Sequence, residues 1–449
     1  MKKTVCMLLC LALLLPCLSG CGDTEPLQVW CAEGTENFVQ QAAYMQKQID
    51  DKFACEVTVF REDAAAGDGF ALTQDLQSQL MAGEGPDLVL FTEEDFTDVR
   101  KLTESGCFLD LSGYLENSEK IDPEEYIEGI FTDGCVGEMC HYLPLGFTAV
   151  SYLTTGMTLA DNGWTEPETL TDVLQQGESI AEGTGGYAYL MCPLTETDWD
   201  YAFEFLFRAS GLELIDDENG TVLPDEGGLK QFLEGYRHIW EVQWLNAKAA
   251  DAEMPDILGY WGEHFAEKSF AYLFWNYPLI TVNAGMLVPE EQGARINVLP
   301  DLRGGTAGEV TVYAAINAGS ERSDAAWALM ERMLGETMQE KILSDYDNSE
   351  AFRVPVRKDC LQEWIDAYWR ERENAYVEDS QGMLQPYLPI EESMAAAFEA
   401  RMEEAVSVYN SQTVIRMLWD TMQPYFEGSG SYDSCITELR ETLTLYAGE

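Results

Sequence analysis

The sequence predicts an α/β protein with two hydrophobic cores, and three observations support this architecture. Residues 27–91 alternate between strand and helix patterns in the order β-α-β-α-β, which indicates a parallel sheet with right-handed crossovers. A second strand-then-helix order covers residues 296–334. The chain has 449 residues, which is enough for two sizeable hydrophobic cores.

The first strands and helices follow from the spacing of apolar residues. Strands are expected at Leu27–Trp30, at Cys55–Phe60 and at Pro86–Phe91, where the last is an apolar run typical of a strand buried on both faces. Between these strands, apolar residues at helical spacing predict two amphipathic helices. Their buried faces would consist of Phe38, Ala42, Met45 and Ile49, and of Leu72, Leu76 and Leu80.

The middle of the chain is expected to contain a hairpin, two helices and a strand over Phe270–Pro278, and the part after Arg357 is expected to be helical. A hairpin between Gly134 and Tyr142 comes first. A helix over residues 169–182 follows, and then a strongly amphipathic helix from Leu229 to Trp244 whose aromatic residues should be core. Near the C-terminus, helices are clearest over residues 391–409 and 415–425.

The stretch from Ile296 to Arg357 has the most distinctive order of elements. An apolar strand ends before a Gly-Gly loop, and an alternating strand at Val310–Ile316 follows. The next helix could be capped by Ser320 or Ser323 and should end at Gly335. Its buried face would carry Trp327, Met330 and Leu334.

The order of short motifs in this stretch resembles that of extracellular solute-binding proteins of the maltodextrin-binding type. The motifs are Leu299-Pro300, Gly304-Gly305, Ala325-Ala326-Trp327 and Pro355-Val356-Arg357-Lys358. Residues 83–91 resemble the family's third strand, and Leu143–Phe147 resembles its first crossing between lobes. The chain departs from the family at Ser151–Leu159, where an N-K-D/E-L-F motif is usual.

The resemblance implies a two-lobed periplasmic-binding-protein-like fold of type II, with discontinuous lobes joined by hinge crossings. The N-terminal lobe would hold residues 22–146 and 300–336, and the C-terminal lobe residues 147–299 and 337–449. It further implies a receptor of an ABC importer that captures a mono- or oligosaccharide by hinge closure and delivers it to permease subunits. We expect it to act as a monomer.

The N-terminus has the features of a bacterial lipoprotein signal. Lys2 and Lys3 precede a short apolar run, and Leu18-Ser19-Gly20-Cys21 resembles a lipobox. We expect residues 1–20 to be removed and Cys21 to carry the lipid that anchors the protein to the extracellular face of the cell membrane. The alternative is a conventional signal cleaved near Gly20, which would leave a free Cys21 thiol.

The charge of the chain bears on its partners. It has 80 acidic against 26 basic residues, a formal net charge of −54. Such a field repels phosphate backbones, so we expect no nucleic-acid binding. A cationic solute such as a polyamine or a peptide is an alternative ligand to sugar, and an acidic site poor in stacked tryptophan would favour it.

The cysteines suggest a disulfide rather than a metal site. A two-residue turn at Gly137-Glu138 would place Cys135 opposite Cys140 in a hairpin, so either a cross-strand disulfide or two unpaired thiols is expected. With three histidines and no C-x-x-C motif, we expect no metal site.

Motifs for catalysis are missing from the sequence. It contains no G-x-S-x-G, H-E-x-x-H or Walker A motif and no complete dinucleotide fingerprint. We therefore expect neither enzyme activity nor a cofactor. A surface glycoside hydrolase with paired carboxylates stays open as an alternative, as does a sensor that binds a solute without transporting it.

Candidate ligand-binding residues are loop residues at the carboxyl ends of sheet strands, where open α/β sheets bind ligands, residues near the crossings, and residues of the Phe270–Pro278 stretch, which resembles the family's strand at the cleft. Aromatic rings can stack on a sugar face, while carboxylates, amides or arginine bond its hydroxyls. The candidates are Glu33, Thr92, Glu93, Phe147, Trp275, Asn276, Tyr277, Tyr313 and Arg353. We expect Trp275 and Phe147 to be the most important of them.

Overall fold

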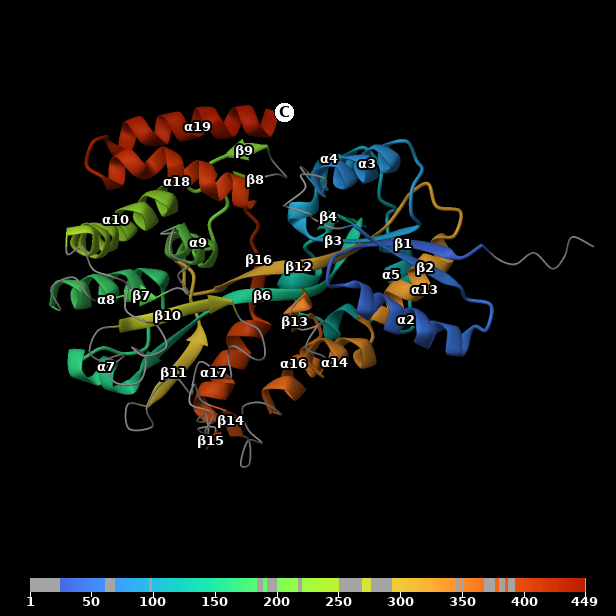
Figure 1. Ribbon diagram of the computed structural model, residues 1–449, viewed down its shortest axis with the longest axis horizontal. Coiled ribbons are helices and arrows are strands. Elements are labelled where there is room, and N and C mark those ends of the chain that lie inside the picture. The colour runs from blue at the N-terminus through green and yellow to red at the C-terminus, as the bar shows by residue number, and fades with distance from the viewer. Residues whose placement is uncertain are drawn as a thin grey trace, which may run out of the picture.

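A computed structural model shows the fold of the chain (Figure 1). The described residues are 25–60, 69–96, 99–183, 189–191, 200–216, 220–249, 269–275, 293–344, 348, 351–366, 376–378, 384–386 and 392–448. Two lobes lie side by side, and β6 (Tyr142–Thr155) and β12 (Thr306–Ile316) run across the middle between them.

The first sheet contains the predicted parallel strands. β1 (Leu27–Ala32) pairs in parallel with β2 (Cys55–Phe60) on one side and with β3 (Leu88–Phe91) on the other. β12 pairs antiparallel with β3, so the strand order is β2-β1-β3-β12-β6. The β-α-β-α-β prediction for residues 27–91 is thus confirmed.

Helices cover this first sheet. α2 (Glu36–Ile49) buries Phe38, Val39 and Ala42, and α13 packs against it. The helical elements of this part of the chain are α3 (Gly69–Met81), η2 (Glu93–Asp95), α4 (Val99–Glu104), α5 (Ser112–Asn117), η3 (Pro123–Glu125), α6 (Glu128–Phe131), α13 (Ser323–Leu334) and α14 (Glu336–Ser344).

The predicted cap of α13 is wrong. Arg322 is the N-cap residue and its side chain forms no capping hydrogen bond. The Ser320 hydroxyl donates instead to Asp87 Oδ1 at 2.6 Å, and the Ser323 hydroxyl donates to the Ser320 carbonyl oxygen at 3.0 Å. Ser320, which the local pattern assigned to the helix cap, thus makes a tertiary contact with Asp87 instead. Gly335 ends the helix as predicted.

β6 connects the two sheets. Its first half pairs with β12, whereas residues 150–155 pair with β10 (Ser269–Trp275) and β11 (Ala294–Val298). β7 (Tyr189–Met191) lies beyond β10. The other elements here are α7 (Gly156–Asn162), α8 (Leu170–Gly183), α9 (Asp200–Ala209), β8 (Ile215–Asp216), β9 (Thr221–Val222), α10 (Glu226–Ala249), α18 (Gln412–Phe426) and α19 (Tyr432–Gly448).

Aromatic side chains fill the core of the second lobe. Phe203 of α9 contacts Tyr236 and Phe232 of α10 and Trp419 of α18, with ring centroids 5.0–5.7 Å apart. The predicted core role of the aromatic face of α10 is therefore confirmed for Phe232, Tyr236 and Trp240. Such large rings bury much apolar surface per residue.

The chain returns to the crossing twice after β12. β13 (Val354–Pro355) pairs with β6, and β16 (Ala405–Ser407) pairs with β12. The helix predicted over residues 391–409 ends at Glu403, because the residues that follow join β12. The remaining elements are α16 (Lys358–Ile365), β14 (Tyr376–Glu378), β15 (Leu384–Pro386) and α17 (Glu392–Glu403), with the hairpin β4 (Cys135–Val136) and β5 (Met139–Cys140) earlier in the chain.

Two separate clusters of buried apolar side chains define the cores. Met338, Trp364 and Phe398 belong to the first cluster, although their segment was expected in the C-terminal lobe. α18 and α19 contribute to the second cluster. The residues at which the lobes divide stay a prediction. The elements of the first cluster form the first lobe, and those of the second cluster form the second lobe.

Candidate functional site

The candidate site is the junction where the lobes meet, around the middle of β6 and β12. Gly146 on β6 lies against Phe352, and a Cβ atom at this position would overlap the Phe352 carbonyl oxygen. Glycine therefore allows the 352–354 segment to approach the crossing strands closely. Thr311 on β12 also holds this segment, since its hydroxyl donates to the Phe352 carbonyl oxygen at 2.9 Å.

The carboxyl end of β3 contributes polar groups to the junction. Thr92 and Asp95 form a capping box around η2, in which the Thr92 N–H donates to Asp95 Oδ2 at 2.6 Å. This box fixes the short helix directly after the buried strand. Within η2, Glu94 Oε1 accepts a hydrogen bond of 2.8 Å from the backbone N–H of Gln412, the first residue of α18.

An arginine connects the second lobe to the crossing strands. Arg208 on α9 pairs with Glu309 on β12 at 2.7 Å and with Glu204 on its own helix at 3.0 Å, and it donates to the Asn410 carbonyl oxygen at 3.3 Å. Burial acts to lower the pKa of Arg208, but Glu309, Glu204 and Glu94 outweigh it, so the pKa is raised and the guanidinium stays charged.

A half-buried carboxyl group, that of Asp133, lies on the first-lobe side of the junction. The Tyr313 hydroxyl on β12 donates to Asp133 Oδ2 at 2.5 Å. Burial raises the pKa of Asp133, and hydrogen bonds from Tyr313 and Ser407 act in the opposite direction. The Tyr313 ring stacks on Phe91 with centroids 5.5 Å apart.

Several predicted ligand residues come together at this junction. Phe147 is fully buried between β12 and the 353–354 segment, and Tyr313 is fully buried as well. In this arrangement neither ring has surface to offer a ligand. Arg353 is half-buried beside Phe147 and has a φ of +61°, a left-handed conformation that costs free energy in a non-glycine residue.

The remaining candidates are placed only in part. Glu33 is exposed in the turn after β1, and Thr92 is half-buried at the end of β3. Trp275 is the last residue of β10, and its backbone pairs with Val150. The side chains of Glu93 and Trp275, and all of Asn276, Tyr277 and Cys21, lie outside the described residues.

Four polar residues of the junction were absent from the sequence-based candidates. They are Glu94, Asp133, Arg208 and Glu309. Glu94 lies three residues after the end of β3 and next to Glu93, so the strand-end rule that gave Glu93 could have included it. The other three have no local signal, because Arg208 and Glu309, for instance, are 101 positions apart in the chain.

The hairpin β4–β5 has the expected register. Cys135 lies opposite Cys140, their Cα atoms are 3.9 Å apart, and a disulfide joins the two sulfurs. Val136 and Met139, at the tip, are about half exposed. The hairpin is thereby closed at its base, next to the Asp133 side of the junction.

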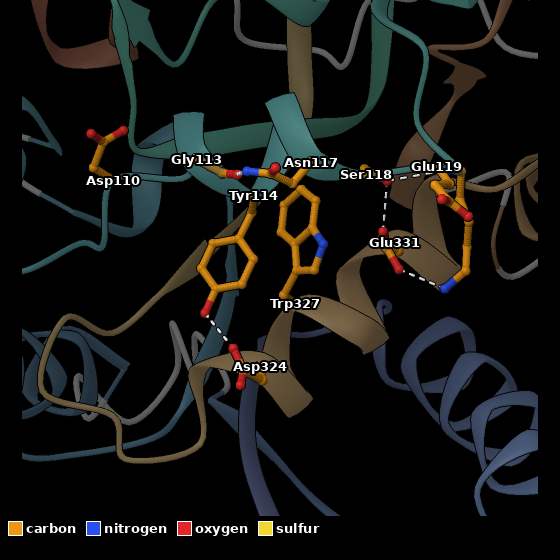
Figure 2. Close-up of a pocket in the computed structure, with 10 residues that line it drawn as sticks. Asp110, Gly113, Tyr114, Asn117, Ser118, Glu119, Asp324, Trp327 and Glu331 are labelled. Atoms are coloured by element: carbon orange, nitrogen blue, oxygen red, sulfur yellow. Dashed lines mark hydrogen bonds and ion pairs between the residues drawn. The ribbon is translucent and has the colours of Figure 1, made fainter.

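A second polar region lies away from the junction, on the outer surface of the first lobe. Between α5 and α13 there is an open hollow of about 720 Å³ (Figure 2). The Tyr114 ring stacks on Trp327 and its hydroxyl donates to Asp324 Oδ1 at 2.8 Å. Glu331 accepts hydrogen bonds from Ser118 and Lys120, both at 2.6 Å.

In the described part of the chain, no group of three or more His, Cys, Asp or Glu side chains is arranged to hold a metal ion. Among the helices of that part, none combines the length and the apolar character needed to cross a membrane.

Solved structures with the same fold come from several bacteria. The sugar-binding protein MalE from the phytopathogen Xanthomonas citri has a TM-score of 0.64 at 14% identity, covering 94% of this chain and 97% of that one. The cyclic alpha-maltosyl-1,6-maltose binding protein from Arthrobacter globiformis has a TM-score of 0.60 at 12% identity, covering 94% and 98%. At these identities the likeness shows the fold.

A third structure is an ABC transporter solute-binding protein from Thermotoga lettingae, bound with alpha-D-tagatose, with a TM-score of 0.54 at 15% identity, covering 94% of this chain and all of that one. None of the curated proteins compared with the chain matches it. The family model described as bacterial extracellular solute-binding protein matches residues 39–340, about two-thirds of the sequence. By this match, and in agreement with its two-lobed fold, the chain belongs to the bacterial extracellular solute-binding proteins.

Proposed function

We propose that this protein is the lipid-anchored receptor of an ABC importer and that it captures a mono- or oligosaccharide between its lobes. The observation that carries the proposal is the crossing itself. β6 and β12 pass side by side from one lobe to the other, and polar side chains of both lobes meet around them. A rotation about these strands would open and close a site between the lobes.

Sugar is the preferred ligand class because of the likeness to sugar-binding structures from Xanthomonas citri, Arthrobacter globiformis and Thermotoga lettingae. Thr92 and Arg353 are half-buried at the junction and have the chemistry to bond sugar hydroxyls. Trp275, at the end of β10, is the candidate for stacking on a sugar ring.

A cationic solute is the second candidate, and one observation favours it. Among the described residues, the charged network around Arg208 contains three carboxylates, those of Glu94, Glu204 and Glu309, and Arg353 adds a second guanidinium at the junction. A polyamine or a basic peptide would balance such a surplus of negative charge.

The family supports an ABC permease as the partner, and the N-terminal sequence supports a lipid anchor. Cys21 would carry the lipid, and the closed receptor would dock on the permease subunits of the importer. No chemical step is part of this function, so incubation with a bound sugar should release no new reducing ends.

Thermal unfolding of residues 22–449 tests the ligand class. Maltotriose, tagatose, spermidine and a lysine-rich tripeptide would each be added over a range of concentrations. A ligand at ~100 times its dissociation constant stabilises the native state by roughly 2.7 kcal/mol, which raises the unfolding temperature by several degrees. A saturable shift with a sugar supports the proposal. A shift confined to spermidine or the peptide would transfer it to the cationic class, and no shift with any compound would contradict both.

A further inference from the structure

A hydrogen bond joins the two lobes outside the crossing strands. Glu94 Oε1, on η2 of the first lobe, accepts it from the backbone N–H of Gln412 in the second lobe, at 2.8 Å. The two residues are 318 positions apart in the chain. Both are exposed, so water can reach the bond.

The donor is a group that its own helix leaves without a partner. Gln412 is the first residue of the 15-residue helix α18, and first-turn N–H groups lack carbonyl partners within a helix. The Ser411 side chain caps Val414 N–H, so Gln412 N–H is left for another acceptor. A carboxylate is suited to this position, since the helix dipole also favours negative charge there.

Each end of the bond is fixed within its own lobe. The capping box of Thr92 and Asp95 holds η2, and Phe96 directly after it is buried in the first cluster. On the other side, the Asn410 side chain accepts from Leu214 N–H at 2.8 Å and donates to the Leu212 carbonyl oxygen at 2.7 Å. The bond therefore reports the position of one lobe relative to the other.

We propose that Glu94 is a positioning residue that holds the lobes together by clasping the N-terminus of α18, independently of any bound solute. This inference rests on the proposed function insofar as lobe closure is the means of capture. A carboxylate at an exposed helix N-terminus is expected to change an equilibrium by about two- to fivefold. The apparent affinity for solute would change by a similar factor at most, since it scales with the fraction of competent protein.

Distances between labels on the two lobes test this inference without any solute. Tyr44 on α2 and Leu445 on α19 are 67% and 71% exposed, so each can be replaced by an encoded amino acid carrying a spin label. In the full chain, purified in detergent, Glu94→Ala should raise the ratio of separated to closed lobes two- to fivefold. The control Glu104→Ala, on an exposed residue of α4 in the same lobe, should leave the distance distribution unchanged.

The donor can be removed as well, without disrupting its helix. Proline lacks the N–H but is well tolerated at the first helical position, and Ser411 before it already has the extended backbone that proline requires, with φ −57° and ψ 150°. Gln412→Pro should therefore change the distances as Glu94→Ala does. The double variant should add little to either single change.

Two results would overturn the inference. One is an unchanged distance distribution in both single variants. The other is an additive effect in the double variant, which would show that the two residues act separately. The measurement contains no sugar, so its failure is distinct from failure of the proposed function, which the thermal shifts test.

Discussion

The hollow on the first lobe and the junction between the lobes contain the same types of charged residue, but their contacts connect different parts of the molecule. In the hollow, Glu331 of α13 bonds Ser118 and Lys120, so the polar contacts tie together elements of one lobe (Figure 2). At the junction, Arg208 of α9 bonds Glu309 of β12, so the contact ties a lobe to the strands that cross between lobes.

Substitutions in the two regions should therefore differ in their effects on protein stability and on the position of the lobes. A change in the hollow should alter the free energy of unfolding of the first lobe and leave the distance between the lobes as it is. A change at the junction should alter both, because the same contacts hold the lobes relative to one another. Three substitutions test the comparison.

The largest effect is expected for Phe147→Ala, beneath the polar part of the junction. The side chain is fully buried, and removing such a ring leaves a cavity that costs about 3–5 kcal/mol of unfolding free energy. Urea unfolding, followed by tryptophan fluorescence, would measure the loss.

Phe147→Leu is the matched variant, since it should recover most of the lost stability. It also separates the two roles of Phe147. A Leu variant with near-normal stability but without the sugar-dependent thermal shift would show that the ring contacts the ligand, against its burial in this arrangement.

Arg208→Met should have the next largest effect. It leaves Glu309 and Glu204 without their cation in a partly buried place, for an expected cost of about 2–4 kcal/mol. Because the network lies at the junction, the distance between labels at Tyr44 and Leu445 should change too.

The control for Arg208 is Arg440→Met on α19. Arg440 pairs with Glu226 at 2.7 Å, but both side chains are about half exposed, so its loss should cost less than about 1 kcal/mol. If Arg208→Met lowered the free energy of unfolding no more than this control, the junction network would behave like an exposed ion pair. The proposed difference between the junction and the hollow would then be wrong.

Glu331→Gln tests the hollow and carries a pH dependence. Burial acts to raise the pKa of Glu331, but hydrogen bonds from Lys120 and Ser118 outweigh it, so its pKa lies below the ordinary value. The charged form therefore stabilises the native state above the ordinary glutamate pKa of about 4.3, and this stabilisation is lost as the pH falls through the lowered pKa. At pH 7 the substitution should cost about 1 kcal/mol.

Urea unfolding of both proteins from pH 7 down to about pH 2 would follow this difference, which should shrink as the pH falls. The label distance between the lobes should stay the same throughout. A change of that distance in Glu331→Gln would show that contacts in the hollow, like those at the junction, affect the position of the lobes.

The elements that could be predicted from the sequence are those with a local periodic signal. The alternation of residues 27–91 gave the parallel strands β1, β2 and β3, because apolar spacing directly reflects burial. The aromatic face of α10 was found in the same way.

Tertiary contacts account for what the sequence could not reveal. Ala405–Ser407 follows a helix in the sequence but pairs with β12 as a strand, so the predicted helix extended too far toward the C-terminus. Phe147 was placed at the crossing from its motif, yet the face on which a strand side chain lies depends on register, and here that face is core. Arg208 and Glu309 meet through the fold alone.

The position of β12 also bears on the order in which the protein can fold. This strand lies between β3 and β6, yet it is synthesised roughly 150 residues after β6 and more than 200 after β3. Until it arrives, both neighbours keep an unpaired edge, and contacts so distant in sequence form slowly. The first sheet can therefore be completed only after Ile316, the last residue of β12, has been synthesised.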